Sequence, residues 1–310
     1  MIGIVILNYN NYQDTLSCID NILDNKIKED FFIYVVDNKS TNDSVKYISD
    51  KVNGINNARL IENQVNGGFS AGNNVGFRQA INDGCRYILC TNNDVLFKKD
   101  AINLMIDRLD KESDCAVCGP KVYLPDGSVQ NCNKGILDAH TFVVRRKGLN
   151  IFDITGREKK YTYKSYNYDG LLYPLGMVSG CCFLIRSDVL EKIGYLDENV
   201  FLYHEEDILG AKLRKINYKV VLDPKAEIIH FGGKSTGPSV NAFGRYQTFR
   251  SAMYYLINYT KNGWFWMSMA KAVVKSGFFI KGIFNKEYRK YYKELKRDIK
   301  SFKLNAKNVH

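Results

Sequence analysis

Four groups of polar residues stand directly after apolar runs in this chain. IYVV precedes Asp37 and Asn38, YILCT precedes an Asn-Asn-Asp run that ends at Asp94, VFLY precedes an acidic run that ends at Asp207, and AEII precedes His230. In open α/β sheets, ligands bind beyond the carboxyl ends of the strands. We therefore expect these strand ends to form one site that holds a nucleotide diphosphate, a divalent cation and a general base.

The elements that must position these residues follow from the hydrophobic pattern. Short apolar runs alternate with segments of helical periodicity through residues 1–120, as in a series of β-α-β units. The expected strands are residues 2–7, 32–36, 58–61 and 86–91, and the expected helices lie within residues 16–23, 45–52, 71–81 and 101–109, with residues 40–43 capping the second helix. The pattern predicts an α/β fold with a mainly parallel sheet flanked by helices.

The second half of the chain is less regular at first. Residues 121–176 are rich in Tyr, Lys and Gly, and we interpret them as long excursions over one edge of the sheet. Regular patterning resumes with a strand at 182–185, a helix at 188–193, a helix after Glu206 and strands near 219–222 and 226–230. From about residue 243 the pattern is helical to the end.

Charge and cysteine content exclude several classes of protein. The formal net charge is +11, but residues 261–310 hold 13 Lys or Arg and three acidic residues, so the rest is close to neutral. A nucleic-acid enzyme more often spreads its basic face over the catalytic body, so we expect no nucleic-acid partner. Eight cysteines scattered through apolar runs indicate a reducing compartment, and Cys115-x-x-Cys118 lacks a second pair at zinc spacing. The first residues predict a buried strand and not a signal peptide.

The basic tail has the composition of a surface-seeking helix. Residues 264–284 are apolar but contain Lys271, Lys275 and Lys281, which disfavours a membrane-spanning segment. Aromatic and aliphatic residues beside lysines at helical spacing are typical of an interfacial amphipathic helix. We predict peripheral contact with an anionic membrane; a helical cap or an oligomer contact, such as a homodimer, remains the alternative.

Several motifs, taken together and in order, resemble family 2 glycosyltransferases of the GT-A fold, in the branch of rhamnosyltransferase-like enzymes of bacterial polysaccharide assembly. The matching stretches are VILNYN (residues 5–10), VVDN (35–38) with Ser40, NGGFSAGNNVGF (66–77), NND (92–94), Ser179-Gly180, FLYHEE (201–206), and His230 followed by GGKS. The resemblance implies a catalytic domain over residues 1–242, with a nucleotide-binding half (1–120) and an acceptor and catalytic half (121–242). Residues 243–310 would form a basic helical extension.

The resemblance implies a nucleotide-sugar donor bound by the first half. Asp37 is expected to accept the imide N–H of uracil or thymine, which favours a UDP- or dTDP-sugar; a turn or helix-cap aspartate is the alternative. Arg78 either meets phosphate or solvates a helix face. The other predicted nucleotide contacts are Asn8, Tyr9, Asn10, Asn38, Asn66, Gly67, Gly68, Asn92 and Asn93.

Asn92-Asn93-Asp94 stands where the family has its DxD motif, with Asn92 in place of the first acid. A divalent cation, Mn²⁺ or Mg²⁺, stabilises the charge of a departing diphosphate and favours oxygen ligands. Asp94 is the predicted carboxylate ligand and His230 the predicted second ligand.

An inverting transfer needs a carboxylate that takes the proton of the acceptor hydroxyl. The resemblance places the family's acid pair on Glu205 and Glu206, with Glu206 at the catalytic position and Asp207 as the alternative if the alignment shifts by one residue. Ser179 and Gly180 are expected to leave room for the acceptor sugar, which is a glycan or a polyprenyl-diphosphate-linked glycan. Because such acceptors lie at the cytoplasmic side of the membrane, we expect the protein in the cytoplasm, at the inner face of the cell membrane.

Two other functions remain open from the sequence. A sugar-1-phosphate nucleotidyltransferase shares the nucleotide, the metal and the sheet, but would open with a Gly-rich, Arg-containing phosphate loop where this chain has NYNN (residues 8–11). A non-catalytic glycan-binding protein is supported only by Asn92.

Overall fold

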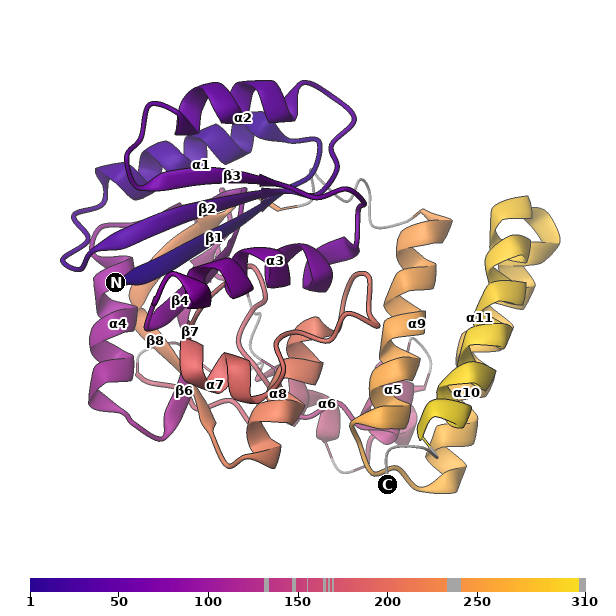
Figure 1. Cartoon of the computed structure of the whole chain (residues 1–310). Coiled ribbons are helices and arrows are strands. Elements are labelled where there is room, and N and C mark those ends of the chain that lie inside the picture. Colours follow the sequence, from indigo (N-terminus) through magenta and orange to yellow (C-terminus); the bar gives the residue numbers. More distant parts are fainter. Residues whose placement is uncertain are drawn as a thin grey trace.

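The computed structural model describes most of the chain, as a mixed sheet with helices on both faces (Figure 1). The described residues are 1–130, 134–146, 149–154, 156–163, 166, 168, 170–232 and 241–306. Cys132 and the GKS of the last motif (Gly233, Lys234 and Ser235) lie outside these residues.

The sheet has eight strands in the order β3-β2-β1-β4-β7-β6-β8-β5. The first three neighbours of this order are parallel pairs, whereas β7 runs antiparallel to both β4 and β6. The strands are β1 (Ile2–Asn8), β2 (Phe31–Asp37), β3 (Ala58–Glu62), β4 (Tyr87–Asn92), β5 (Val95–Phe97), β6 (Cys115–Tyr123), β7 (Cys182–Arg186) and β8 (Lys219–His230). The predicted α/β class and the four predicted strands of the first half are confirmed.

Two hydrophobic cores form, one on each face of the sheet. Figure 1 shows α1 and α2 on one face of β1–β3 and α3 on the other. The helices of the sheet domain are α1 (Tyr12–Asp24), α2 (Ser44–Val52), α3 (Gly68–Asn82), α4 (Ala101–Lys111), α5 (Ala139–Val144), α6 (Arg157–Thr162), α7 (Ser187–Lys192) and α8 (Glu205–Lys215), with a 3-10 turn η1 (Asn150–Phe152).

Small residues bring α3 close to the strands beneath it. A Cβ at Gly72 would lie 2.6 Å from Leu7 Cδ1, and a Cβ at Gly76 would lie 2.5 Å from Val5 Cγ1. Any larger side chain would push the helix off the sheet, because close-packed interiors have little room for extra atoms. The glycines of the 66–77 motif therefore fix the helix on β1, which sets the position of the loop before it.

Two strands were absent from the sequence prediction, and one predicted break does not occur. The hydrophobic pattern did not predict β5 and β6, and it predicted irregular structure from residue 121 and two strands in place of β8. The structure extends β6 through Pro120 to Tyr123 and runs β8 through Pro224, with a register shift at Pro120/Lys121. Proline is tolerated in a sheet at such irregularities, because no ladder hydrogen bond is lost there. The register shift beside Pro120 is such an irregularity.

The last three helices pack as a separate layer beside the sheet domain. They are α9 (Ala242–Asn258), α10 (Trp264–Phe284) and α11 (Lys286–Ala306), and Figure 1 shows α10 and α11 on the side of α9 away from the sheet. Their core also takes in α5 and residues from the start of α8 and the loop before it, such as Val200 and Ile208. The predicted helical end of the chain is confirmed over the described residues. None of the helices described is both long and apolar enough to cross a membrane.

Candidate active site

Strand register brings the predicted nucleotide contacts together at one edge of the sheet. Asn8, the last residue of β1, is paired with Asp37, the last residue of β2, and Leu7 is paired with Asn92, the last residue of β4. Because these strands are parallel, their carboxyl ends meet at the same edge. The predicted convergence of the first two polar groups is therefore confirmed.

Asp37 is buried and its carboxylate is held within the chain. Asp37 Oδ1 accepts hydrogen bonds from Asn8 Nδ2 at 2.7 Å and from Ser40 Oγ at 2.6 Å, and Oδ2 accepts one from the Ser40 N–H at 2.8 Å. These are the contacts of a turn aspartate. A carboxylate offers about four lone-pair sites, so one of them remains for a base imide. The nucleobase role of Asp37 stays a prediction.

Asn38 ties the loop before α3 to the end of β2. Its Nδ2 donates to Asn66 Oδ1 at 2.9 Å and to the Gly68 carbonyl at 3.0 Å, and its Oδ1 accepts from Asn63 Nδ2 at 3.1 Å. Gly67 N–H also points to Asn38 Oδ1, at 3.4 Å. Asn38 therefore shapes the glycine loop, and any effect on a donor acts through that loop.

Gly68 joins the nucleotide side of the site to the segment before α8. Its φ is +82°, and a Cβ there would lie 2.1 Å from the Phe201 carbonyl oxygen. The Phe69 N–H donates to the same oxygen at 2.8 Å. Only glycine accommodates both the left-handed backbone and this approach.

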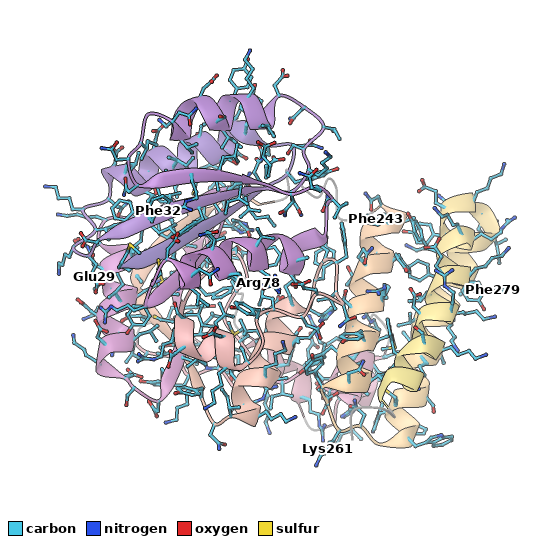
Figure 2. The ribbon with its side chains drawn as sticks, viewed as in Figure 1. Glu29, Phe32, Arg78, Phe243, Lys261 and Phe279 are labelled. Atoms are coloured by element: carbon cyan, nitrogen blue, oxygen red, sulfur yellow. The ribbon has the colours of Figure 1, made fainter. Side chains whose placement is uncertain are left out.

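Other predicted nucleotide residues either form hydrogen bonds that hold neighbouring loops or lie partly exposed to solvent. Asn10 Oδ1 accepts the Thr41 N–H at 2.7 Å, and Asn93 Nδ2 donates to the Asn11 carbonyl at 3.0 Å. Tyr9 is half-buried at the same edge. Arg78 pairs with Glu198 at 2.8 Å and lies over the Tyr195 ring, on the outer side of α3 (Figure 2). This arrangement shows the solvated helix-face alternative for Arg78; a phosphate contact stays a prediction.

Asp94 and His230 face each other without a hydrogen bond between them. Asp94 Oδ1 is buried and has no hydrogen-bond partner, and it lies 3.3 Å from His230 Nε2. The pairing of Val95 with His230 in β5 and β8 produces this proximity. His230 Nδ1 lies 3.1 Å from Gln130 Oε1, which fixes the orientation of the ring, and Nε2 is the nitrogen that faces Asp94 and lies 3.5 Å from Asn92 Nδ2. An unpartnered carboxylate oxygen opposite an imidazole nitrogen fits Mn²⁺ or Mg²⁺.

A second acidic cluster lies at the opposite edge of the sheet. Glu112, Asp114 and Cys115 offer ligand atoms within 4.8 Å of one another at the start of β6. The neighbouring cations already occupy the two carboxylates, since Arg108 pairs with Glu112 at 3.0 Å and Lys219 with Asp114 at 2.6 Å. This cluster therefore gives no support to a metal at the donor edge.

The small acceptor-side residues reach the site because β7 is antiparallel to β4. Thr91 pairs with Cys182, so the residues just before β7 lie at the carboxyl end of β4, and the Asn92 N–H donates to the Cys181 carbonyl at 2.8 Å. A Cβ on Gly180 would lie 3.9 Å from Glu206 Oε2. Gly180 therefore lies beside that carboxylate oxygen, and its role at the acceptor stays a prediction.

The three acids at the start of α8 have different environments. Burial and the adjacent Glu206 raise the pKa of Glu205 to about 8, and Glu205 Oε2 has no hydrogen-bond partner. Asp207 is buried, but Lys134 and His204 outweigh this burial and lower its pKa; His204 Nδ1 lies 2.7 Å from Asp207 Oδ2. Glu206 is half-buried and forms an ion pair with Lys134 through Oε1. Of the three, Glu206 is the carboxylate beside Gly180.

The turn that leads into α8 is strained and braced from outside. Tyr203 and His204 both have positive φ, 70° and 67°, which costs free energy for residues with a side chain. Ser251 of α9 donates to the Leu202 carbonyl at 2.9 Å, and Asn74 of α3 donates to the Leu196 carbonyl at 2.9 Å. Helices on both sides of the site therefore hold the acidic turn in place.

Sequence reasoning missed Lys134, Gln130 and the role of His204. Lys134 and Gln130 lie in the irregular segment after β6, where no motif or periodicity marks them. Their place in the site is visible only from two long-range contacts: the β-bridge between Lys134 and Met177, and the contact between Gln130 Oε1 and His230 Nδ1. His204 stood inside the acidic run, and its three-residue spacing to Asp207 was the available signal.

Comparison with known proteins agrees with this geometry. Residues 3–194 match the profile of the family described as glycosyl transferase family 2. The chain belongs to this family. It is 27% identical over 154 residues to an N-acetylglucosaminyl-diphospho-decaprenol L-rhamnosyltransferase of Mycobacterium tuberculosis, a match that covers 49% of this chain and 48% of that relative. The chain thus spans about half the length of the curated relatives it matches.

Solved structures share the fold at low identity. GalNAc-T7 with UDP, GalNAc and Mn²⁺ superposes with a TM-score of 0.60 at 12% identity, over 82% of this chain and 47% of that one. The mannosyltransferase PcManGT from Pyrobaculum calidifontis, with GDP-Man and Mn²⁺, gives a TM-score of 0.54 at 13% identity, over 98% and 86%. The fold is therefore the GT-A fold expected from the sequence motifs.

Proposed function

We propose that this protein transfers a sugar from a nucleotide-diphosphate donor to a glycan or lipid-linked glycan acceptor, with inversion at the anomeric carbon. The observation that carries the proposal is that Asp94, whose Oδ1 has no hydrogen-bond partner, faces His230, while the Glu206 carboxylate lies beside Gly180 just before β7, next to the end of β4. Asp94 lies 3.3 Å from His230, and Glu206 Oε2 faces Gly180. Residues 1–242 would form the catalytic part and residues 243–310 its helical extension.

Glu206 is the base in this proposal. Its Oε2 removes the proton of the acceptor hydroxyl, the hydroxyl oxygen forms the new bond to the anomeric carbon, and the bond to the nucleoside diphosphate breaks on the opposite face. Glu205 is less suited to this role, because its raised pKa, about 8, keeps it protonated at neutral pH. Asp207 is engaged by His204 and buried among α8 contacts.

Asp94 and His230 are the proposed ligands of a divalent cation. Gln130 orients His230 for this role, and Asn92, which replaces an acid, lies 3.5 Å from His230 Nε2. A bound Mn²⁺ or Mg²⁺ offsets negative charge on a departing diphosphate. Two structures with this fold contain Mn²⁺, which supports the proposal.

The donor is proposed to be a UDP- or dTDP-sugar. The one lone pair that Asp37 keeps free suits the imide N–H of uracil or thymine. The rhamnosyltransferase relative is named for a decaprenol-diphosphate acceptor, which supports a polyprenyl-linked acceptor here. We place the reaction in cell-surface polysaccharide synthesis, at the cytoplasmic face of the membrane.

The helical pair α10–α11 offers a surface for that membrane. The inner side of α10 is buried at every fourth residue, at Ala270, Val274, Phe278 and Gly282. Its outer side near the C-terminal end exposes Phe279 (56%), Ile280 (58%), Ile283 (53%) and Phe284 (88%). Figure 2 shows Phe279 on the side of the hairpin that faces away from the sheet.

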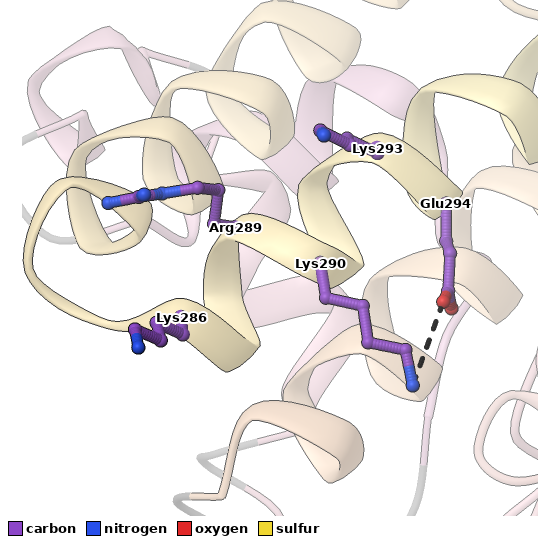
Figure 3. Close-up of a pocket in the computed structure, with 5 residues that line it drawn as sticks. All are labelled: Lys286, Arg289, Lys290, Lys293 and Glu294. Carbon is purple, nitrogen blue, oxygen red and sulfur yellow. Dashed lines mark ion pairs between the residues drawn. The ribbon is translucent and has the colours of Figure 1, made fainter.

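Basic residues stand beside this apolar end. Figure 3 shows Lys286, Arg289, Lys290 and Lys293 on the first turns of α11, with Glu294 facing Lys290 at 4.0 Å. Arg289 also donates to the Gly282 carbonyl at 3.0 Å and so caps the end of α10. Each cation near an anionic leaflet contributes about 1 kcal/mol. Exposed aromatics beside four cations fit an anionic lipid surface.

Vesicle binding tests this surface. We expect the protein to sediment with vesicles of phosphatidylglycerol and phosphatidylethanolamine but not with phosphatidylcholine alone, and binding to weaken with salt. The variant Ile280→Asp/Phe284→Asp should lose binding, whereas Ile151→Asp, which changes a 74%-exposed residue elsewhere, should keep it. Equal loss in both variants, or equal binding to neutral vesicles, would remove the membrane from the proposal.

Nucleotide release tests the enzyme. The protein would be incubated with UDP-, dTDP- and GDP-sugars and membrane lipid extract, with Mn²⁺, Mg²⁺ or EDTA, as wild type and Glu206→Gln. We expect release of one nucleotide that EDTA and the variant both abolish. Pyrophosphate released from a nucleoside triphosphate would instead indicate a nucleotidyltransferase. Nucleotide binding without release from any donor would indicate a glycan-binding protein.

A further inference from the structure

Lys134 contacts the acidic start of α8 from a segment that is distant in sequence. Its Nζ forms an ion pair with Glu206 Oε1, and both side chains are largely shielded, 29% and 15% exposed. Its backbone is fixed as well: the Lys134 N–H donates to the Met177 carbonyl at 3.0 Å, and the Gly176 N–H donates to the Lys134 carbonyl at 2.9 Å. The strand bridge that places Lys134 therefore leads directly to Gly180.

Charge around the acids makes Lys134 their principal counter-ion among the described residues. Glu205, Glu206 and Asp207 are consecutive, and Lys134 lowers the pKa of Asp207 and opposes the rise in the pKa of Glu205. His204 contacts Asp207 alone. Glu206 has no cation partner in the described part of the chain besides Lys134. Carboxylates this close repel one another unless a cation stands among them.

The two oxygens of Glu206 are used differently. Oε1 is held by Lys134, and Oε2 lies 3.9 Å from the position that a Cβ on Gly180 would occupy. If the Glu206 side chain were free to rotate, either oxygen could face the acceptor. Proton transfer requires a fixed orientation of the base, and this orientation would be lost.

We propose that Lys134 is a positioning residue for the reaction: by holding Glu206 Oε1 it fixes the orientation of the carboxylate and directs Oε2 toward Gly180. This inference rests on the proposed function for the identity of the base. It adds a residue to the site that the family motifs in this sequence do not contain.

Kinetics of Lys134→Met and Lys134→Arg test the role. In Lys134→Met we expect kcat to fall about a hundredfold, within the range that a general base contributes, with the donor KM unchanged. Lys134→Arg keeps a cation and should recover most of the loss. Lys51→Met, which breaks the pair with Asp20 on the opposite side of the sheet, is the matched control and should keep wild-type kcat. Thermal unfolding of each variant accompanies the rates.

Two kinetic results would overturn the proposal. One is a kcat in Lys134→Met close to that of the wild type. The other is a loss that Lys134→Arg does not recover although its thermal unfolding matches that of the wild type.

A measurement without turnover separates this inference from the function. In protein with ¹³C-labelled glutamate carboxyl groups, a Glu206→Gln spectrum assigns the Glu206 signal. We expect the chemical shift of that signal to move in Lys134→Met, because the ion pair at Glu206 Oε1 is lost. An unmoved signal overturns the role of Lys134 even if the enzyme is active. A moved signal with no donor cleaved by the wild type supports the pairing and rejects the glycosyltransferase.

Discussion

The donor edge of the sheet and the start of α8 differ in how many of their buried polar atoms have hydrogen-bond partners. At the donor edge, Asn8, Asp37 and Asn38 bond to one another and to the loops around them. Glu205 Oε2 and Asp207 Oδ1 at the start of α8, like Asp94 Oδ1 at the proposed metal site, are buried without a hydrogen-bond partner. Buried polar atoms are nearly always partnered, so unpartnered ones indicate where a ligand or a proton is handled.

Backbone conformation separates the two regions further. The donor edge follows strand ends in continuous register, with single left-handed residues, Asn10 and Lys39, in the loops after β1 and β2. The α8 turn has two consecutive left-handed residues, Tyr203 and His204, and the residues just before them bond to Phe69 of α3 and Ser251 of α9. The donor edge is held by hydrogen bonds among its own side chains, whereas the α8 turn combines backbone strain with three adjacent acidic residues. Chemistry is expected where the strain and the unpartnered groups are found.

The largest effect should come from the carboxylate that faces Gly180. We expect Glu206→Gln to lower kcat about a thousandfold while nucleotide binding is kept, because the base is lost but the shape is preserved. Glu205→Gln should change kcat far less, because Glu205 already carries a proton at neutral pH. Steady-state rates with nucleotide affinity measured by calorimetry check both. The reverse order of effects would move the base by one residue.

The contact between the two regions depends on Gly68, and Gly84 supplies a matched control. Gly68→Ala should lower the free energy of unfolding by about 4 kcal/mol, since it adds both a left-handed alanine and a clash with Phe201. Gly84 has nearly the same φ, +80°, with nothing within 4 Å, so Gly84→Ala should cost about 1–2 kcal/mol. Urea denaturation of the two variants isolates the clash. Equal losses would mean that the contact with Phe201 yields easily.

The pH dependence of stability should reveal the buried acid. Glu205 titrates near 4.5 when unfolded and near 8 when folded, so its contribution to stability is full below pH 4.5 and is lost as the pH rises through 8. Glu205→Gln removes this exchange. We therefore expect the stability of the variant, relative to wild type, to increase from pH 5 to pH 8. Asp207 has the opposite dependence, but it is present in both proteins and cancels. A flat difference would contradict the raised pKa.

The smallest effect is expected at Arg78, whose interpretation the sequence left open. Its pair with Glu198 is nearly half exposed, 47% and 45%, so Arg78→Ala should change stability by no more than about 0.5 kcal/mol. The donor KM decides its role: a severalfold rise indicates a phosphate contact, and no change indicates a solvated helix face. Glu198→Ala, which frees Arg78, is the companion variant.

The sequence predicted the donor edge well because its signals are local. Apolar runs ending in polar residues placed β1, β2 and β4, and parallel pairing alone aligns such ends. The strands β5 and β6 were missed because one is very short and the other contains Pro120, tolerated only because a bulge accommodates it. The placement of Asp94 beside His230 was inferred from motif resemblance, and the pairing of β5 with β8 supplies its structural reason.

By itself, the sequence determined which residue types stand at the ends of β1, β2 and β4 and that the last helices combine apolar and basic residues. Only the tertiary structure decided what each acid at the start of α8 can do. Lys134, Gln130 and Gly180 reach the site through long-range strand pairing, and burial and charge there depend on neighbours tens of residues away. Strand ends are encoded locally, whereas the ionisation of a carboxyl group depends on everything that surrounds it.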